Sequence, residues 1–447
     1  MRLQAGLLAA RATGAAARLA GRGGTSLPGK VLTRVEPHAI ARLAARLPQG
    51  SVVVSATNGK TTTAAMVSAI LRRTGTRLVH NRAGANMAGG VAAALAAERG
   101  DMGLFEVDEF WLGPVAGELA PRAVLLGNLF RDQLDRYGEL EIIADRWAAI
   151  VAGLPEATGL VLNADDPLVA DLGRAREPLY FGVHDDALAL PELQHASDSK
   201  HCRRCGHAYV YEAAYLAHLG RYACPNCGAR RPDPAVIASA VELRGIRSAA
   251  FTLTTPQGER RIELPLPGVY YVYNALGAAA LCLLLGVPLD EVAAGLAAVA
   301  PAFGRAETVD LGGRPTSILL VKNPAGANEV LRTLALEARK LDLFGVLNDR
   351  TADGRDVSWV WDADWVIVAP HVRRLTCSGT RAAELALRLK YAGVDPARLK
   401  VVDDLERGLD TALSDGEGPL YALPTYTALL ELKDLLARRG QGAEYWR

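Results

Sequence analysis

The sequence predicts an α/β protein built on a doubly wound parallel sheet, with a four-cysteine insertion and a second, smaller α/β domain of Rossmann-like type. Three observations support this prediction: a phosphate-binding loop between a strand and a helix, apolar strands that end in polar residues, and two closely spaced cysteine pairs. At 447 residues the chain is too long for one hydrophobic core. We expect a helical leader over residues 1–35, a nucleotide-binding domain over 36–308 with an insertion at 198–232, and a C-terminal domain over 309–447.

The bulk composition is that of a folded, soluble protein, with 50% hydrophobic and 22% charged residues. A net charge of +1 gives no reason to expect a nucleic-acid partner. No apolar run reaches the roughly 18 to 20 residues of a membrane span, and no signal-peptide core is evident, so we expect a cytoplasmic protein. The first 35 residues contain arginines but no acidic residue, as in a transit peptide or a membrane-surface helix; we favour a helix that lies on the domain.

The phosphate loop lies between a predicted strand and a predicted helix. The β-branched run Val52–Val54 predicts a buried strand, and residues 64–71 have helical spacing. The general phosphate-loop pattern has glycine at the position of Val54, so the match is incomplete. An ordinary turn that happens to contain Gly-Lys-Thr is the alternative, and the strand before and the helix after argue against it.

The residue types in this loop suit a nucleotide phosphate. Backbone N–H groups at a helix N-terminus point toward an anion, and the helix dipole favours negative charge there. In such a loop Lys60 reaches the β- and γ-phosphates and the Thr61 hydroxyl binds Mg²⁺. We therefore predict an ATP-binding enzyme. The expected nucleotide-binding residues of the loop are Thr57, Asn58, Gly59, Lys60, Thr61 and Thr62.

Polar residues follow several of the predicted strands. Glu106 ends an apolar strand and is the first choice for a Mg²⁺ ligand, with Asp108 and Glu109 as alternatives, because a phosphate loop requires a carboxylate for its metal. Strands predicted at 123–128 and 159–163 also end in polar residues. A tyrosine-rich stretch at 266–274 repeats the pattern and leads into a helix. We expect these ends to form one nucleotide site at one edge of the sheet.

Four of the six cysteines form two C-x2-C pairs with zinc-ribbon spacing. A glycine follows each pair, where a left-handed turn is needed. Disulfides are the alternative, which is disfavoured in a cytoplasmic protein. We predict a structural zinc site; its ligands are Cys202, Cys205, Cys224 and Cys227. Cys282 is expected to be a packing residue, and Cys377 receives no role.

The C-terminal segment is expected to hold a second sheet. Residues 348–362 interleave aspartates with two tryptophans, which favours a recognition or catalytic loop over a polar turn before a strand. The predicted elements are strands beginning at 316, 342, 365 and 420, a helix at 328–340 and a final helix through 438.

Together these motifs resemble the central domain of the Mur ligases. The stretches that carry the resemblance are Ala56-Thr-Asn-Gly-Lys-Thr-Thr62, the Glu106 strand, Asn128 with Asp132-Gln-Leu-Asp-Arg136, Asn163-Ala-Asp-Asp166, Asn274 and Gly304-Arg-Ala-Glu307. The chain is most similar to the MurT family, the Mur ligase-like subunits of lipid II isoglutaminyl synthase. That similarity rests on the cysteine insertion, Lys322-Asn-Pro-Ala-Gly326, Asp353-Gly-Arg-Asp-Val-Ser-Trp359 and Pro424-Thr-Tyr-Thr427.

The resemblance implies a reaction and a partner. ATP would phosphorylate the α-carboxyl of D-glutamate in the lipid II stem peptide, and ammonia would displace phosphate to give D-isoglutamine. The ammonia would come from glutamine, hydrolysed by a separate class I glutaminase subunit of the GatD type. Asp356 would complete the partner's Cys–His pair, with Asp353 and Asp349 as alternatives. The reaction would place the protein at the inner face of the membrane, held there only through its lipid-linked substrate.

The resemblance also implies roles for residues outside the loop. Arg305 would steady the transferring phosphoryl group, and Asn274 and Asp166 would lie on the adenine and ribose side. Two departures from ordinary Mur ligases bear on the metals: Gln133 replaces a histidine, and no lysine occurs between Lys60 and Lys200 that could be carbamylated to hold a second Mg²⁺. A conventional Mur-type amino-acid ligase, and an ATP-dependent scaffold that binds nucleic acid, are the competing hypotheses.

Overall fold

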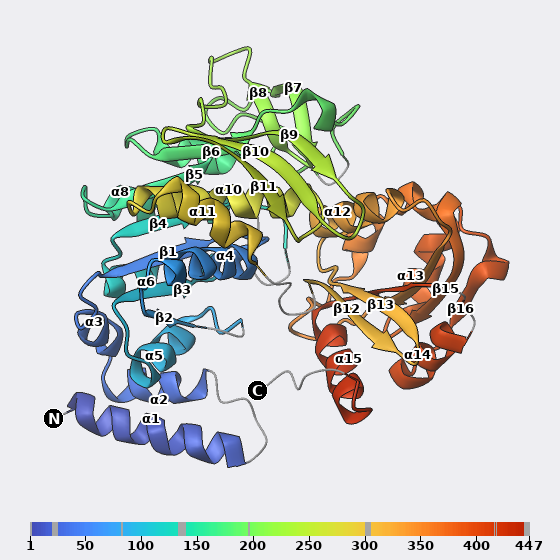
Figure 1. Cartoon of the computed structure of the whole chain (residues 1–447), viewed down its shortest axis with the longest axis horizontal. Helices are drawn as coiled ribbons and strands as arrows, with labels where there is room; N and C mark the ends of the chain where they lie inside the picture. The colour runs from blue at the N-terminus through green and yellow to red at the C-terminus, as the bar shows by residue number, and fades with distance from the viewer. Residues whose placement is uncertain are drawn as a thin grey trace.

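The computed structural model describes residues 2–19, 26–81, 84–132, 140–194, 197–299, 305–414, 416 and 418–441. Two α/β units lie side by side, one built on a nine-stranded sheet and the other on a six-stranded sheet (Figure 1). The glycines at 21–24, which favour a flexible joint within the leader, lie outside the described residues, as do Gln133 and its neighbours through 139. Within the described ranges, none of the helices combines the length and apolarity that a membrane-spanning helix needs.

The larger sheet has the order β11-β10-β9-β6-β5-β4-β1-β3-β2, in which β1 lies between β4 and β3. Strands β1 to β6 and β9 pair in parallel, and β10 and β11 extend the sheet antiparallel. The strands are β1 Ser51–Ser55, β2 Leu78–His80, β3 Met102–Glu106, β4 Ala123–Leu126, β5 Gly159–Asn163, β6 Leu179–Val183, β9 Val236–Leu243, β10 Ala249–Thr255 and β11 Gly258–Leu264. This is the doubly wound sheet that the sequence predicts.

Helices cover both faces of this sheet, and β1 contributes to both cores. Val52 and Val54 pack into one core with α4, α10 and α11, whereas Val53 packs into the other with α3, α5, α6 and α8. Because successive strand residues face opposite sides, a strand covered on both faces is apolar throughout. The helices are α3 Ala39–Ala44, α4 Lys60–Arg73, α5 Ala88–Ala97, α6 Leu112–Leu119, α8 Leu140–Gly153, α9 Pro167–Ala170, α10 Val269–Leu284 and α11 Leu289–Ala297.

One predicted strand end is a helix. The tyrosine-rich stretch belongs to α10, whose N-cap Gly268 has a φ of +87°, and Asn274 lies inside that helix. Almost every side chain of α10 is buried, so its sequence is a continuous apolar run. A buried strand has the same pattern, and the sequence alone therefore does not distinguish the two. Asn274 therefore reaches the site from a helix and not from a strand end.

The N-terminal leader lies on the larger unit. Helix α1 (Arg2–Leu19) packs against α2 (Leu27–Val35) and α5. Leu7 and Ala10 are buried in the same core as α5 and α6. The structure therefore confirms the helix that lies on the domain.

The cysteine insertion follows β6. It contains the hairpin β7 (Val210–Leu216) and β8 (Leu219–Ala223), which pair antiparallel and form a sheet of their own. In Figure 1 this hairpin lies at the top of the molecule, beyond β6 and β9.

The smaller unit has the strand order β12-β13-β17-β14-β15-β16. Its first strand already begins at Arg305, ahead of the boundary expected after residue 308. The strands are β12 Arg305–Leu311, β13 Arg314–Leu319, β14 Leu341–Val346, β15 Val372–Ser378, β16 Leu399–Val401 and β17 Leu420–Pro424. The helices are α12 Pro324–Ala335, α13 Ala382–Tyr391, α14 Leu405–Ser414 and α15 Tyr426–Arg438. Short 3₁₀ helices lie at Asp171–Gly173, Asp186–Leu188, Ser358–Trp361, Trp365–Ile367, Ala369–His371 and Pro396–Arg398.

Two predictions for this unit are wrong in detail. The helix expected at 328–340 starts earlier, at Pro324, because the Asn323 side chain accepts a hydrogen bond from the Gly326 N–H (2.9 Å) and proline suits the first helical turn. The strand expected at 365–368 is a 3₁₀ helix. Its backbone bonds locally, with the Val368 N–H donating to the Trp365 carbonyl (3.2 Å), so no strand pairing forms.

Candidate functional site

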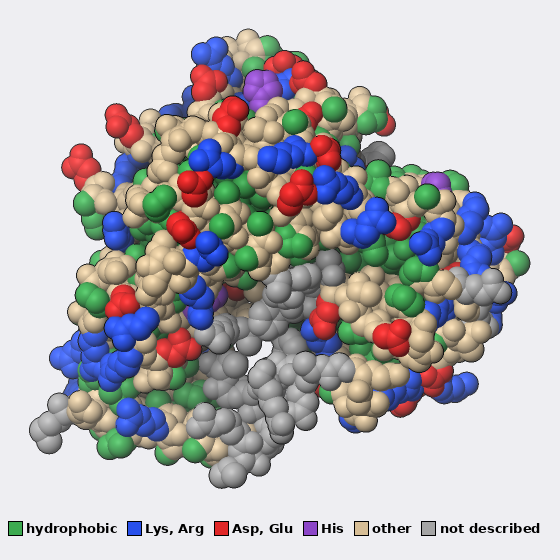
Figure 2. Space-filling view, viewed as in Figure 1, with side chains coloured by type: hydrophobic (Ala, Val, Ile, Leu, Met, Phe, Trp, Pro, Cys, Tyr) green, Lys and Arg blue, Asp and Glu red, His purple; other side chains and the backbone are tan. Residues whose placement is uncertain are grey.

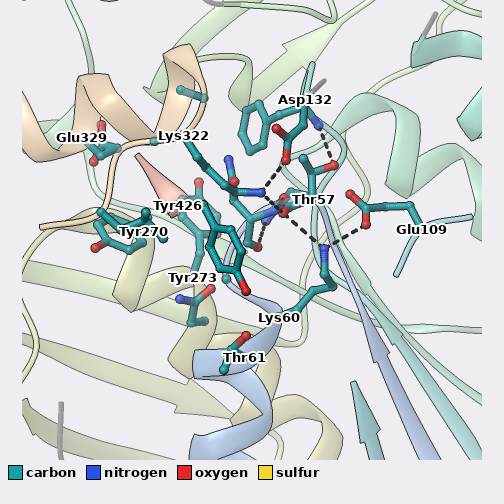
Figure 3. Close-up of a pocket in the computed structure, with 18 of the residues that line it drawn as sticks. Thr57, Lys60, Thr61, Glu109, Asp132, Tyr270, Tyr273, Lys322, Glu329 and Tyr426 are labelled. Atoms are coloured by element: carbon teal, nitrogen blue, oxygen red, sulfur yellow. Dashed lines mark hydrogen bonds and ion pairs between the residues drawn. The ribbon is translucent and has the colours of Figure 1, made fainter. Parts of the chain in front are cut away.

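A cavity of about 340 Å³ lies where the two units meet. The larger unit contributes the phosphate loop, the residues after β3 and β4, and one side of α10. The smaller unit contributes the end of β13, the start of α12 and Tyr426 at the start of α15. Figure 3 shows side chains from both units pointing into this space.

Gly59 shapes the phosphate loop. It caps the N-terminus of α4 with a φ of +87°, a conformation that L side chains rarely adopt. A Cβ atom at this position would lie 2.0 Å from the Asn274 Oδ1 atom. The loop can therefore approach α10 closely only with glycine here, which brings Asn274 against the loop.

Asn128 at the end of β4 holds the loop from the other side. Its side chain accepts a hydrogen bond from the Asn58 N–H (2.9 Å) and donates one to the Asn58 carbonyl (3.0 Å). Its carbonyl accepts a bond from the Thr57 N–H (3.0 Å), and the Thr57 hydroxyl accepts one from the Phe130 N–H (3.1 Å). These bonds occupy polar groups of Thr57 and Asn58 and fix the loop before any ligand binds.

Lys60 is buried at the base of the cavity beside a carboxylate. Its Nζ atom lies 2.8 Å from Glu109 Oε2 and also donates to the Ala56 carbonyl. Burial alone would lower the pKa of Lys60, but the charges of Glu109, Asp108 and Glu106 outweigh burial and raise it. Burial alone would raise the pKa of Glu109, and the charges of Lys60 and Lys322 instead lower it. Lys60 is therefore a permanent cation that faces the cavity.

Glu106 lies beside the first turn of α4. The Thr61 hydroxyl donates to Glu106 Oε1 (3.0 Å). The Asn81 side chain holds the Glu106 backbone, since it accepts from the N–H (2.9 Å) and donates to the carbonyl (2.7 Å). A hydroxyl and a carboxylate are hard oxygen donors, which is the donor type that Mg²⁺ prefers. This pair therefore fits the Mg²⁺ site that the sequence predicts. Glu109, one of the alternative ligands, forms an ion pair with Lys60 instead.

The smaller unit adds a second lysine to the cavity. Lys322 Nζ pairs with Asp132 and lies 3.4 Å from the Thr57 carbonyl (Figure 3). The next residue, Asn323, donates from its side chain to Asn58 Oδ1 (3.0 Å). The Lys-Asn-Pro motif was predicted to mark the family, but its contact with the phosphate loop was missed. No local pattern connects residues that lie more than 260 positions apart in the chain.

Not every predicted nucleotide-binding residue reaches the cavity. Thr57, Asn58, Gly59, Lys60, Thr61 and Asn274 line it. Thr62 is buried and is not among the lining residues. Asp166 is fully buried and caps α9 by accepting hydrogen bonds from Leu168 and Val169. The structure therefore gives Asp166 a positioning role, and its side chain does not line the cavity. Arg305 opens β12, and its side chain lies outside the described residues.

The four paired cysteines converge as the spacing predicts. Their Sγ atoms all lie within 4.8 Å of one another, with 3.6 Å between Cys202 and Cys227 and 3.5 Å between Cys205 and Cys224. A disulfide is far shorter, about 2.05 Å, so none of the four is oxidised to another. Separations near 3.5 Å fit thiolates around one tetrahedral zinc ion, with Zn–S bonds of about 2.3 Å. The predicted left-handed glycines are also confirmed, with φ of +74° at Gly206 and +72° at Gly228.

The two remaining cysteines are buried side chains of the cores. Cys282 lies in α10 and Cys377 in β15, and both are fully buried. Burial raises the pKa of the Cys377 thiol to about 12. The predicted packing role of Cys282 is confirmed, and Cys377 has the same role.

The three candidate aspartates of the tryptophan loop have different surroundings. Asp353 is buried and accepts hydrogen bonds from the N–H (2.7 Å) and hydroxyl of Thr427. Asp349 accepts from the Thr380 hydroxyl (2.8 Å) and from Arg381 (2.8 Å). Asp356 is exposed and accepts a hydrogen bond from the N–H of Ser358, two residues on (2.8 Å). Hydrogen bonds from Ser358 lower the pKa of Asp356, so it is an exposed carboxylate at neutral pH.

Comparison with known proteins identifies the family. Residues 54–227 match the Mur ligase middle domain, and residues 320–429 match the MurT ligase C-terminal domain. The MurT subunit of the lipid II isoglutaminyl synthase (glutamine-hydrolyzing) of Streptococcus pneumoniae is 32% identical over 441 residues, which cover 97% of each chain. The corresponding Staphylococcus aureus subunit is 31% identical over 96% of each chain. The chain belongs to the MurT family. It is therefore a ligase, and its relatives support a role in peptidoglycan synthesis.

Solved structures show that the MurT chain has the Mur ligase fold. A pseudomurein peptide ligase type C from Methanothermus fervidus superposes with a TM-score of 0.70 at 23% identity, covering 89% of this chain and 80% of that one. MurF from Acinetobacter baumannii superposes with a TM-score of 0.65 at 18% identity, covering 90% and 78%. The predicted fold class, with its cysteine cluster and its C-terminal α/β domain, is confirmed.

Proposed function

We propose that this chain amidates the D-glutamate α-carboxyl of the lipid II stem peptide, with ATP as the energy source. The observation that carries the proposal is the cavity itself. The phosphate loop with Lys60 faces a cavity whose other side is lined by the segment around Lys322, which lies in the part of the chain that matches the MurT C-terminal domain. The MurT subunits of two bacterial lipid II isoglutaminyl synthases align with 96% to 97% of this chain at 31% to 32% identity, which supports this choice of substrate.

The proposed chemistry has two steps. A substrate carboxylate oxygen attacks the γ-phosphorus of ATP, so an acyl phosphate forms and ADP leaves. Ammonia then attacks the carbonyl carbon, the C–O bond to phosphate breaks, and D-isoglutamine and inorganic phosphate result. Lys60 and the loop amides hold the phosphates, and positioning with charge stabilisation supplies most of the rate in such transfers. Lys60 and Lys322, one from each unit, are two cations whose Nζ atoms both lie 3.4 Å from the Thr57 carbonyl oxygen, and they are suited to charge that develops on the transferred group.

Thr61 and Glu106 are the residues that would hold Mg²⁺. When bound, this ion neutralises phosphate charge and orients the β- and γ-oxygens. Asn274 lies against the loop and is proposed to contact the nucleotide. Arg305 is proposed to steady the transferred phosphoryl group. Zn²⁺ is proposed to be structural, since four thiolates leave no open coordination position.

A partner must supply the ammonia. All six cysteines lie in the described part of the chain, four of them in the cluster and two buried, so none is an accessible glutaminase nucleophile there. The relatives are named as subunits of a glutamine-hydrolysing synthase. We propose a class I glutaminase partner of the GatD type that meets the C-terminal domain. We propose that Asp356, which is exposed and ionised, orients the partner's histidine.

The proposed site of action is the cytoplasmic side of the membrane, where a lipid-linked substrate is accessible. We also propose a division into two domains, with the boundary moved from residue 308 to the start of β12 at Arg305. The first domain would bind ATP and the second would bind the partner.

The test is amidation of lipid II with ATP and either glutamine or ammonium chloride, with and without the glutaminase. We expect glutamine to require the partner and ammonium to support this chain alone. If an amino acid is ligated with release of ADP while neither nitrogen source gives amide, the chain is a stand-alone Mur-type amino-acid ligase.

A further inference from the structure

The charge of the chain is concentrated at its N-terminus. Residues 1–50 contain eight Lys or Arg and one Glu, a net charge of +7, although the whole chain carries only +1. The single acid, Glu36, is buried and pairs with Arg42 (2.8 Å). Such asymmetry in a neutral protein indicates a surface for an anionic partner.

Three arginines from separate elements meet at one surface cavity. Arg11 comes from α1, Arg46 follows α3, and Arg99 follows α5. The cavity has a volume of about 270 Å³, and Gln4, Leu7 and Leu8 complete its lining. No carboxylate lines it, and none of the three arginines forms an ion pair with any residue that the structure describes. Three like charges held together without a counter-charge favour the binding of an anion.

The same helix presents apolar side chains outward. The inner face of α1 packs closely on α2, since a Cβ atom on Gly6 would lie 2.9 Å from Leu32 Cδ1. The outer face carries Ala5, Ala12 and Leu8, and Leu8 is 65% exposed. A helix with basic and exposed apolar side chains together is typical of a membrane surface.

We propose that this face, formed by Arg11, Arg46, Arg99 and the outer side of α1, docks onto the anionic head groups of a lipid bilayer. Figure 2 shows Lys and Arg side chains gathered at the left edge of the molecule, close to the N-terminal end of the chain. Lipid is favoured over nucleic acid because the first 50 residues contain no aromatic side chain to stack on bases, whereas they do expose leucine. The inference rests on the proposed function, because a lipid-linked substrate requires an enzyme at the bilayer. It departs from the expectation that the membrane is reached only through the substrate.

The test is sedimentation of the full zinc-loaded chain with vesicles that lack lipid II and ATP. Vesicles of phosphatidylcholine with about one-third phosphatidylglycerol are compared with phosphatidylcholine alone. We expect binding to the anionic vesicles only, weakened by salt. The triple variant R11Q/R46Q/R99Q should bind roughly 100-fold more weakly, since each basic residue near a surface contributes about a factor of five.

The control variant is R247Q/R407Q/R438Q. It removes three exposed arginines that lie outside the N-terminal segment and form no ion pair with any residue that the structure describes. It should bind like the wild type, and Leu8→Gln should lose about fivefold by removing the apolar contact. The proposal would be overturned if the wild type bound neutral vesicles as well as anionic ones, or did not bind anionic vesicles. It would also be overturned if the control variant lost as much vesicle binding as the triple variant, or if duplex DNA retained the chain more strongly than anionic vesicles do. Because these vesicles lack substrate, the outcome is independent of whether amidation occurs.

Discussion

At the scale of single residues, the cavity depends on buried charges that support one another. Lys60 and Glu109 are both about nine-tenths buried, with side chains 10% exposed. Neither charge is tolerable alone in such surroundings, and together they leave a cation facing the phosphate site. This arrangement makes Glu109 a positioning residue for Lys60, whereas Glu106 accepts a hydrogen bond from the Thr61 hydroxyl and is the proposed metal ligand.

Glu109→Gln should destabilise the protein by about 3 kcal/mol at neutral pH, because a buried lysine loses its counter-charge. The lowered pKa of Glu109 means that its contribution is fully present above the ordinary glutamate value near 4.5 and disappears as the pH falls through the lower folded-state value. Urea unfolding at several pH values measures the free energy of unfolding of both proteins. The difference between the wild type and the variant should therefore become smaller only at acidic pH. A constant gap down to pH values well below 4 would contradict this account.

Gly59→Ala should abolish tight ATP binding. The new Cβ would collide with Asn274 Oδ1 and must also adopt a φ of +87°. Gly75→Ala is the matched control, since its φ is +80° and no atom lies within 4 Å of the added Cβ. The positive φ should cost both variants about 1 kcal/mol of stability, and the collision with Asn274 should cost Gly59→Ala more. Only Gly59→Ala should lose ATP affinity, by at least roughly tenfold in calorimetry. Equal ATP affinities in the two variants would show that the contact with Asn274 is not required.

At the scale of elements, the sequence pattern predicted those strands, helices and clusters that depend mainly on contacts between residues close together in the chain. The strand Ser51–Ser55 and the final helix were predictable because β-branched residues and helical spacing specify them directly. The cysteine cluster was predictable because each knuckle is a four-residue unit with its own glycine turn. Helix α10 was partly missed, since a fully buried helix has no polar face to show its period. Contacts such as Lys322 with Asp132 could not be predicted, because they depend on how two units pack.

The four-cysteine element gives a prediction of its own. Cys224→Ser should release zinc and lower the melting temperature, because a structural metal contributes directly to folding. His207→Ala, beside the same cluster, should retain zinc, since four thiolates already complete the site. Zinc released on unfolding, measured with a colorimetric chelator, distinguishes the two variants. Loss of zinc from His207→Ala would instead indicate a mixed thiolate and imidazole site.

At the scale of the whole molecule, two units share one cavity, and Lys322 makes a charged contact between them by pairing with Asp132. Lys322→Gln should lower the rate of ammonium-dependent amidation by about 10- to 100-fold while KM for ATP changes less, since we propose that the lysine acts on the reacting phosphoryl group rather than on the bound nucleotide. Lys340→Gln is the control, because Lys340 is exposed and bonds only to the Pro370 carbonyl among its recorded contacts. An unchanged rate in Lys322→Gln would leave this lysine with a purely structural role between the units.

The proposed partner subunit also belongs to this scale. Ammonia would come from glutamine through the partner, or from ammonium chloride without it. Asp356→Asn should lower glutamine-dependent amidation by about 10³- to 10⁴-fold, since an amide cannot stabilise a histidine cation in the partner. Amidation with ammonium chloride should be unchanged, because that route needs only the cavity of this chain. Asp395→Asn is a close control: Asp395 is also exposed and accepts from the N–H two residues on (2.9 Å), as Asp356 does. If both nitrogen sources fail in Asp356→Asn, the loop supports the ligase cavity itself; if neither changes, the carboxylate that the partner needs must come from elsewhere.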